Sequence, residues 1–192
     1  ANTGRQVQLC GQSAENLVVN GDFRNGTTGW LSNNLTTTST ANSILLTKEN
    51  PGEKASFRSL STDFRNISAI GDKIYTMARI RCNSTPSNNV YLGNTNSVGD
   101  AAPSYRKLVA NITDWQIVSL VGELDRSGYY LYIGLSLYDT YTGTVDFDYM
   151  EVINLTQTFG AGNEPTKEQC DKLFANYFEG TANTIGTGRV RS

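Results

Sequence analysis

Tyrosine recurs in two strand-like segments of this 192-residue sequence, joined by arginine in one of them, and these residues are its clearest candidates for binding chemistry. Successive side chains point to opposite faces of a β-strand. Residues 73–82 therefore predict one apolar row and one row with tyrosine and arginine, and residues 129–138 predict one apolar row and one row with tyrosine and small residues. Aromatic rings can cover the apolar face of a sugar ring, while arginine and tyrosine side chains hydrogen bond to its hydroxyls. The candidate ligand-binding residues on this predicted Tyr–Arg face are Tyr75, Arg79, Arg81, Tyr91, Tyr130 and Tyr132.

Two other interpretations of these residues stay open. Tyrosine pairs well across strands, so the rows are also typical of an ordinary solvent-facing surface. Tyrosines in expected loops, namely Tyr105, Tyr138 and Tyr141, compete as ligand contacts. The opposite row of residues 73–82 is expected in the core and consists of Ile74, Thr76, Ala78, Ile80 and Cys82.

The sequence offers little for catalysis. It contains no histidine, which removes the usual Ser-His, Cys-His and His-metal arrangements. A pair of carboxylates can hydrolyse glycosides, and Asp146 and Asp148 are such neighbours. Strict alternation, however, places both on the same strand face as Met150 and Val152, which is expected to point into the core. We therefore expect a protein that is not an enzyme.

The charge and hydropathy of the chain argue against two classes of partner. The net charge is −2 and the sequence pI is about 5.2, with no basic cluster of the kind that nucleic-acid binding requires. Nothing approaches the roughly 20 consecutive apolar residues of a membrane-spanning helix. We expect neither nucleic acid nor membrane as a partner.

Three cysteines, Cys10, Cys82 and Cys170, lie far apart in the chain. A disulfide framework or a cysteine-rich zinc site needs closer, paired spacing. We expect small buried apolar residues, and one long-range disulfide stays open as the alternative.

The segments with strand character recur along most of the chain and are separated by turn residues such as Asn50-Pro51-Gly52. Many short strands with turns between them predict a β-sandwich or barrel. Residues 32–42 consist almost wholly of Ser, Thr and Asn and predict a polar loop or an exposed edge. The expected strands are 16–23, 43–47, 55–60, 73–82, 90–92, 105–109, 115–121, 129–138 and 144–153.

The pattern changes after residue 153. Thr166 and Gln169 have capping-box spacing behind a proline, and an apolar i, i+3, i+4, i+7 stripe follows, so one helix is predicted over 166–178. Both chain ends resemble cuts through a longer polypeptide. The expected organisation is a linker or arm at 1–15, a sandwich domain at 16–153, a Gly-rich turn with an amphipathic helix at 154–180, and a linker at 181–192.

Residues 16–23, with the sequence Asn-Leu-Val-Val-Asn-Gly-Asp-Phe, and the later Gly29-Trp30 resemble the opening of galactose-binding-like jelly rolls. They are most similar to carbohydrate-binding modules of the families four, nine and twenty-two type. Tyr75, Trp115 and the run 147–152 stand where those modules carry further marks. The resemblance covers about residues 16–153. It implies an all-β jelly-roll sandwich of two antiparallel sheets, here with a short C-terminal helix.

The same resemblance implies roles for three residues. Trp30 and Trp115 are expected to pack inside the fold. An aspartate at the place of Asp148 often joins a structural Ca²⁺ site near the Asn-Gly-Asp-Phe turn, and carboxylate and carbonyl oxygens suit that cation. The sequence departs from the modules at Arg24, where they frequently carry Glu. A bond from Asp148 to backbone amides of the turn is the alternative to a metal.

Residues 154–166 and the later Tyr177-Phe178-Glu179-Gly180 resemble a segment of phage and prophage tail proteins of Gram-positive hosts. There the segment follows a jelly-roll module in a structural or receptor-binding protein. The two resemblances together imply a virion tail component that binds cell-wall or capsular polysaccharide, with other tail subunits, and possible trimer formation, as partners. Two alternatives stay open: a purely structural spacer or oligomerisation module of a tail fibre, or an accessory module of a secreted glycoside hydrolase at the bacterial surface.

Overall fold

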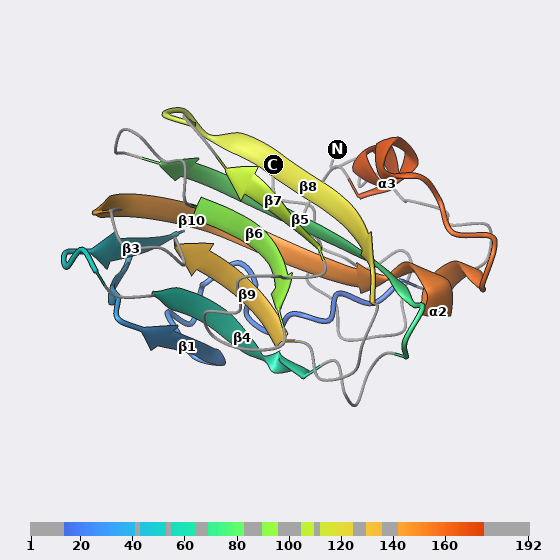
Figure 1. Ribbon diagram of the computed structural model, residues 1–192, viewed down its shortest axis with the longest axis horizontal. Coiled ribbons are helices and arrows are strands. Elements are labelled where there is room, and N and C mark those ends of the chain that lie inside the picture. The colour runs from blue at the N-terminus through green and yellow to red at the C-terminus, as the bar shows by residue number, and fades with distance from the viewer. Residues whose placement is uncertain are drawn as a thin grey trace, which may run out of the picture.

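The protein is a β-sandwich of two stacked antiparallel sheets (Figure 1). The computed structural model describes residues 14–40, 43–52, 55–63, 69–82, 90–95, 105–109, 112–124, 130–135 and 142–174. Sheet A has the strand order β1 (Trp30–Asn33), β4 (Ser56–Asp63), β9 (Tyr130–Leu135), β6 (Val90–Thr95) and β7 (Tyr105–Val109). Sheet B has the order β2 (Thr36–Ser39), β3 (Ile44–Lys48), β10 (Gly143–Asn154), β5 (Lys73–Cys82) and β8 (Gln116–Glu123). The expected all-β class, with two antiparallel sheets and only short helices, is confirmed.

Apolar side chains from the facing sides of both sheets form the main core. The row predicted on β5 is confirmed, because its five members are all buried between the sheets. At one end of the core, the Trp30 and Phe57 rings stack with centroids 4.8 Å apart, and Phe23 lies 5.0 Å from Trp30. Trp30 is 6% exposed, as expected for an indole that buries a large apolar area.

The polar segment 32–42 contributes to two edge strands rather than to a loop. β1 forms one edge of sheet A and β2 one edge of sheet B, and most of their side chains are exposed. The expectation of an exposed edge is therefore right for these residues. Threonine suits this position because a β-branched polar side chain fits a half-solvated strand.

Residues 16–23 were expected as a strand, but the structure assigns no strand there: residues 16–18 lie beside the second half of β10, and residues 19–22 form a turn. The Leu17 amide donates to the Val152 carbonyl and the Met150 amide donates to the Gly21 carbonyl, both at 2.8 Å. The Asn16 side chain accepts from the Val152 amide at 3.1 Å. The backbone groups of β10 that β3 leaves unpaired are satisfied in this way.

Gly21 is expected to tolerate no side chain. A Cβ atom there would approach the Met150 carbonyl oxygen more closely than 3.0 Å, a separation that real Cβ atoms essentially never show. Gly21→Ala should lower the free energy of unfolding by about 1–3 kcal/mol, because crowding in a packed site forces the backbone to shift. Urea unfolding measures the change. Val19→Ala is the control, since this side chain lies two residues away and is 62% exposed. Equal stability of Gly21→Ala and the wild type would contradict the close approach.

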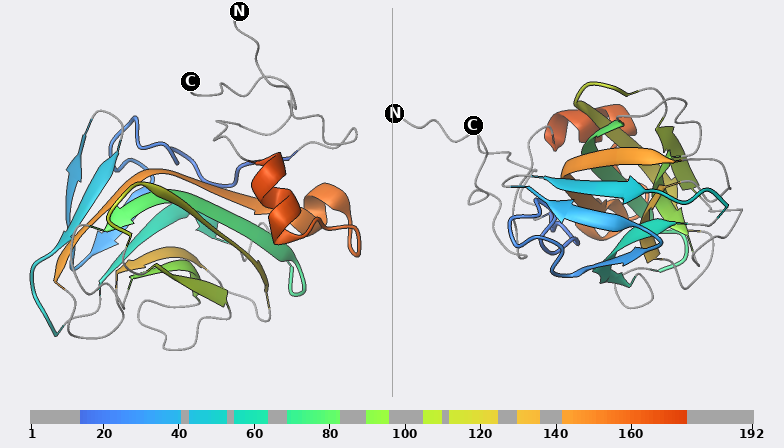
Figure 2. Two further views of the ribbon diagram at one scale, coloured as in Figure 1. Left: turned by 90° about the horizontal axis from the view of Figure 1, so that it is seen from above. Right: turned by 90° about the vertical axis from the view of Figure 1, so that its left-hand side faces the viewer.

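Two short helices cover one end of the outer face of sheet B (Figure 2). α2 (Leu155–Phe159) continues directly from β10, and α3 (Lys167–Leu173) follows a Gly-containing turn. The Thr166–Gln169 capping box is confirmed at the start of α3, which ends at Leu173 with Phe174 as its C-cap. Residues 175–178 of the predicted helix lie outside the described residues. α2 was not predicted. Within the described part of the chain, no helix is long and apolar enough to cross a membrane.

A second apolar cluster lies beneath these helices. Phe174 is 2% exposed and its ring lies 5.5 Å from that of Tyr75. The helical segment therefore packs on its own sandwich. The buried members of this α-side cluster are Tyr75, Met77, Tyr149, Ile153, Leu155, Cys170 and Phe174.

Two carboxylates tie the helical segment to sheet B. Glu164 accepts from the Thr156 hydroxyl at 2.8 Å and forms an ion pair with Lys73 at 3.3 Å. Its own backbone hydrogen bond, the Thr156 hydroxyl and Lys73 hold the pKa of Glu164 below its ordinary value of 4.5. Asp171 is partly desolvated, but hydrogen bonds from Lys167, Ser119 and Tyr75 outweigh this and hold its pKa below the ordinary 3.8. The attachment is consequently strongest when both groups are ionised.

Acid is expected to weaken this attachment. A pKa that is lowered by folding contributes stability above the unfolded value and loses it as the pH falls through the folded value. The thermal midpoint of Glu164→Gln/Asp171→Asn should thus lie below that of the wild type at neutral pH, and the difference should close below about pH 4. Thermal melts from neutral to acid pH measure it. A constant difference down to about pH 2 would show that these carboxylates do not hold the segment.

Candidate ligand-binding face

The residues predicted on one Tyr–Arg face lie on two different sheets. Arg79 and Arg81 belong to β5 of sheet B, whereas Tyr91 belongs to β6 of sheet A. Val90 and Leu92, on either side of Tyr91, are buried between the sheets, so Tyr91 lies on the far side of the sandwich from the two arginines. Alternation assigns faces within a strand but does not say which sheet the strand joins.

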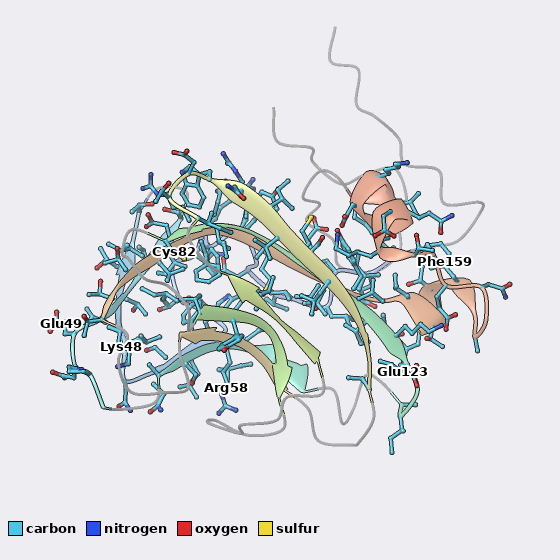
Figure 3. All side chains as sticks on the ribbon, turned by 45° about the horizontal axis from the view of Figure 1, so that its top comes forward. Lys48, Glu49, Arg58, Cys82, Glu123 and Phe159 are labelled. Carbon is cyan, nitrogen blue, oxygen red and sulfur yellow. The ribbon has the colours of Figure 1, made fainter. Side chains whose placement is uncertain are left out.

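Tyr130 and Tyr132 also belong to sheet A, on β9. The register places Tyr132 opposite Arg58 and Gly93, and Tyr130 opposite Asp63 and Thr95. Their side chains lie outside the described ones. Figure 3 shows Arg58 on the side of sheet A that faces away from sheet B. The six predicted residues therefore do not form one site.

Tyr75 is not available as a ligand contact. It has no exposed area, and its hydroxyl donates to Asp171 Oδ1 of α3 at 3.0 Å. Burial raises the pKa of this phenol far above its ordinary value. The sequence placed Tyr75 on the open face because nothing in β5 itself shows that α3 covers this end of the sheet.

Trp115 lies at the surface, and the expectation that it packs inside is wrong. It is only partly buried, and the Arg79 and Arg81 Cζ atoms lie 5.2 Å and 4.8 Å from its ring centroid. The register explains the position: Gln116 is opposite Ile80, so Trp115 directly precedes the first paired residue of β8 and comes beside Arg81. These distances are typical of cation–π contacts, which attract a guanidinium to the electron-rich ring face.

Asp146 and Asp148 of β10 complete this surface. Arg81 Nε donates to Asp146 Oδ2 at 2.6 Å, and Arg79 Nη1 donates to Asp148 Oδ2 at 2.5 Å. The guanidinium side chains are 40% and 41% exposed, whereas the carboxylates beneath them are 6% and 12% exposed. We name the group of Arg79, Arg81, Trp115, Asp146 and Asp148 the Arg–Trp face.

The expectation that Asp146 and Asp148 point into the core is wrong because β10 contains an irregularity. Its register with β5 shifts between Phe147 and Tyr149, so one extra residue enters the strand. Phe147 and Met150 both lie in the core although two residues separate them. Such a bulge reverses the alternation beyond it. Counted from Met150 and Val152, strict alternation therefore places both aspartates on the wrong face.

The surroundings of Asp148 do not fit the Ca²⁺ ion that the resemblance implied. Its carboxylate faces the Arg79 guanidinium, and Asp22 of the Asn-Gly-Asp-Phe turn pairs with Arg24 at 2.6 Å. A guanidinium beside each carboxylate disfavours a second cation. Among the described residues, no group of three or more Asp, Glu, Cys or His side chains is placed to hold a metal. The partner that the structure shows for the Asp148 carboxylate is Arg79.

The two described cysteines do not suit nucleophilic chemistry. Cys82 and Cys170 are buried free thiols, as expected, while Cys10 lies outside the described residues. Burial and the nearby Asp146 raise the pKa of Cys82 to about 11, and burial with Asp171 raises that of Cys170 to about 12. Since the thiolate is the reactive form, both groups act as small apolar side chains.

The sequence matches no family model and no curated protein, so comparison depends on solved structures. A carbohydrate-binding module of family 4 matches with a TM-score of 0.50 and 13% identity, over 71% of this chain and 98% of that one. The CBM22-1 xylan-binding domain of Paenibacillus barcinonensis Xyn10C matches with a TM-score of 0.50 and 12% identity, over 74% and 97%. An arabinose-bound GH51 α-L-arabinofuranosidase matches with a TM-score of 0.52 and 11% identity, over 86% of this chain and 30% of the enzyme. At such identities the likeness shows the fold alone: the chain has a jelly roll like that of carbohydrate-binding modules.

Proposed function

We propose that this chain is a non-catalytic glycan-binding module whose Arg–Trp face contacts the sugar. The observation that carries the proposal is the Trp115 ring at the surface, with the guanidinium groups of Arg79 and Arg81 within 5.2 Å of its centre. An aromatic ring offers apolar area for the C–H groups of a sugar, and guanidinium N–H groups donate to its hydroxyls. The shared fold with carbohydrate-binding modules supports this assignment.

The face is held in place before any ligand arrives. Each arginine is bonded to an aspartate that is almost buried, which restricts the side chain to one position. Ordering a long side chain on binding costs about 0.5–1.5 kcal/mol, so prior ordering favours association. Ile117, which is 52% exposed and opposite Arg79 on β8, adds apolar surface beside the ring.

The proposed setting is a phage tail, where the module recognises cell-wall or capsular polysaccharide on the host. A stacked ring contributes only about 1 kcal/mol, so one module binds weakly and repetition in a multimeric virion supplies avidity. Support comes from the resemblance of residues 154–180 to a segment of phage and prophage tail proteins. Other tail subunits, and a trimer of this chain, are the proposed partners, and the virion is the proposed location.

Binding to an array of bacterial polysaccharides, with the protein clustered on beads, tests the proposal. Trp115→Ala is expected to weaken binding by roughly fivefold per module, because about 1 kcal/mol of stacking is lost. Tyr91→Ala is the matched control, since it removes an aromatic side chain from the other sheet. Circular dichroism confirms that both variants fold.

Each outcome separates one part of the proposal from the rest. No binding to any polysaccharide by the clustered wild type would overturn the glycan function and favour a structural spacer. Binding that Tyr91→Ala abolishes and Trp115→Ala leaves intact would retain the function but overturn its assignment to the Arg–Trp face.

A further inference from the structure

We infer that the Arg–Trp face selects uncharged glycans and excludes polyanionic ones. The inference rests on the proposed function and adds the chemical class of the ligand. It follows from how the charges of the face are paired, since two exposed arginines would otherwise be expected to attract phosphate- or sulfate-bearing polymers.

The two guanidinium charges are already neutralised. Each lies within 2.6 Å of a carboxylate oxygen, so the two arginines and two aspartates sum to zero charge. The adjacent Asp114 is exposed and adds a negative charge, and the whole chain carries −2. Among the residues that the structure describes at this face, a polyanion therefore meets no excess of positive charge.

The hydrogen-bonding groups of the face match hydroxyls. Among the described residues, Arg81 bonds its carboxylate through Nε and Arg79 through Nη1, and a guanidinium has five N–H donors in all. The remaining donors suit the oxygen of a hydroxyl, which can also donate to a nearby carboxylate. A phosphate or sulfate only accepts, and its negative charge would lie a few ångströms from Asp146 and Asp148, where partial burial strengthens the repulsion.

The arginine–aspartate pairing can be tested by removing the two negative charges without changing side-chain shape. Asp146→Asn/Asp148→Asn keeps an acceptor oxygen beside each arginine but leaves two uncompensated guanidinium groups. The control is Glu49→Gln/Glu123→Gln, which changes the net charge equally at two exposed positions at opposite ends of the molecule (Figure 3). Immobilised heparin is the polyanionic probe, and the uncharged polysaccharides of the array are the neutral ones.

The wild type and the Glu49→Gln/Glu123→Gln control are expected to pass heparin unretained at low salt. Asp146→Asn/Asp148→Asn should be retained and then eluted by added salt, because exposed charge interactions are screened beyond about 10 Å at 0.1 M salt. Wild-type binding to an uncharged polysaccharide should change less than about twofold over the same salt range. Arg79→Gln/Arg81→Gln, which loses the donors, should bind the uncharged polysaccharide more weakly and remain unretained on heparin. Thermal melts establish that every variant is folded.

Three results would overturn the inference. Salt-sensitive retention of the wild type on heparin that is lost in Arg79→Gln/Arg81→Gln would show an anion-binding face. A folded Asp146→Asn/Asp148→Asn variant that gains no retention would show that the aspartates do not suppress anion binding. A wild type that binds no glycan of any charge would overturn the proposed function itself, which distinguishes that failure from the first two.

Discussion

Phe57→Ala is expected to lower the free energy of unfolding by about 3–5 kcal/mol, the usual cost of removing a buried phenyl ring. Phe57 has no exposed area, stacks on Trp30 with an interplanar angle of 4°, and lies 6.0 Å from Phe23. The truncation loses the transfer free energy of the ring and leaves a cavity. The Trp30 indole cannot move into this cavity without breaking the hydrogen bond that its Nε1 donates to the Asn20 carbonyl at 3.0 Å. Such a loss is a large part of the about 5–15 kcal/mol that stabilises an ordinary domain.

Urea unfolding followed by tryptophan fluorescence measures this change directly, because one of the two tryptophans is in contact with the missing ring. Leu60→Ala on the same strand is the control. Leu60 is 56% exposed, and its replacement should change stability by no more than about 0.5 kcal/mol. A loss below about 1 kcal/mol for Phe57→Ala would mean that the three rings do not form a closely packed cluster.

The main core was predictable because it depends on local periodicity. The row from Ile74 to Cys82 follows from alternation within one strand, and the structure buries it between the sheets. The capping box of Thr166 and Gln169 is likewise a short-range pattern with a specific backbone partner. Such signals involve residues that are close in the sequence, so their geometry depends little on the remainder of the chain.

The Arg–Trp face was only partly predictable because it depends on contacts between distant segments. Tyr75 follows the same alternation as Arg79 and Arg81, yet α3 covers only the Tyr75 end of β5. Trp115 has a large apolar side chain of the kind usually found in a core. The register of β8 with β5 places it beside Arg81 on the outer face instead. Neither the docking of a helix about 90 residues away nor a strand register is visible in one segment of sequence.

A single inserted residue decided the assignment of the aspartates. Alternation from Met150 and Val152 predicts an inward Asp148, and the register shift after Phe147 turns it toward Arg79. Burying an unpaired carboxylate in the core costs free energy, and the apolar core offers no partner for it. This cost was the one sign in the sequence that an inward Asp148 was wrong. The Asp-x-Asp spacing in β10 equals the Arg-x-Arg spacing in β5, so cross-strand ion pairs were an alternative partner for these carboxylates.

Leu155→Ala/Phe174→Ala is expected to unfold the sandwich and not merely release its helices. Leu155 has no exposed area and Phe174 is 2% exposed, and both contribute to the α-side cluster. Each truncation costs about 2–5 kcal/mol by itself, and two changes in one cluster are coupled rather than additive. Loss of the cover would also leave Tyr75, Met77 and Ile153 of sheet B facing water. The combined cost is comparable to the whole stability of an average domain.

Hydrogen exchange and thermal melting together decide between global and local release of the segment 155–174. Global unfolding predicts that amides of β5 and β10 lose protection along with those of α3, at one lowered melting temperature. Glu168→Ala/Lys172→Ala is the matched control on α3, because both side chains are exposed and the net charge is unchanged. Exchange that increases in α2 and α3 while β5 and β10 keep their protection would contradict the prediction.

Such a result would also mean that the sandwich ends as a folding unit at β10, so that the helical segment serves attachment rather than stability. Cooperative loss would instead make residues 155–174 a structural layer of the sandwich, and the segment that resembles tail proteins could not be separated from it.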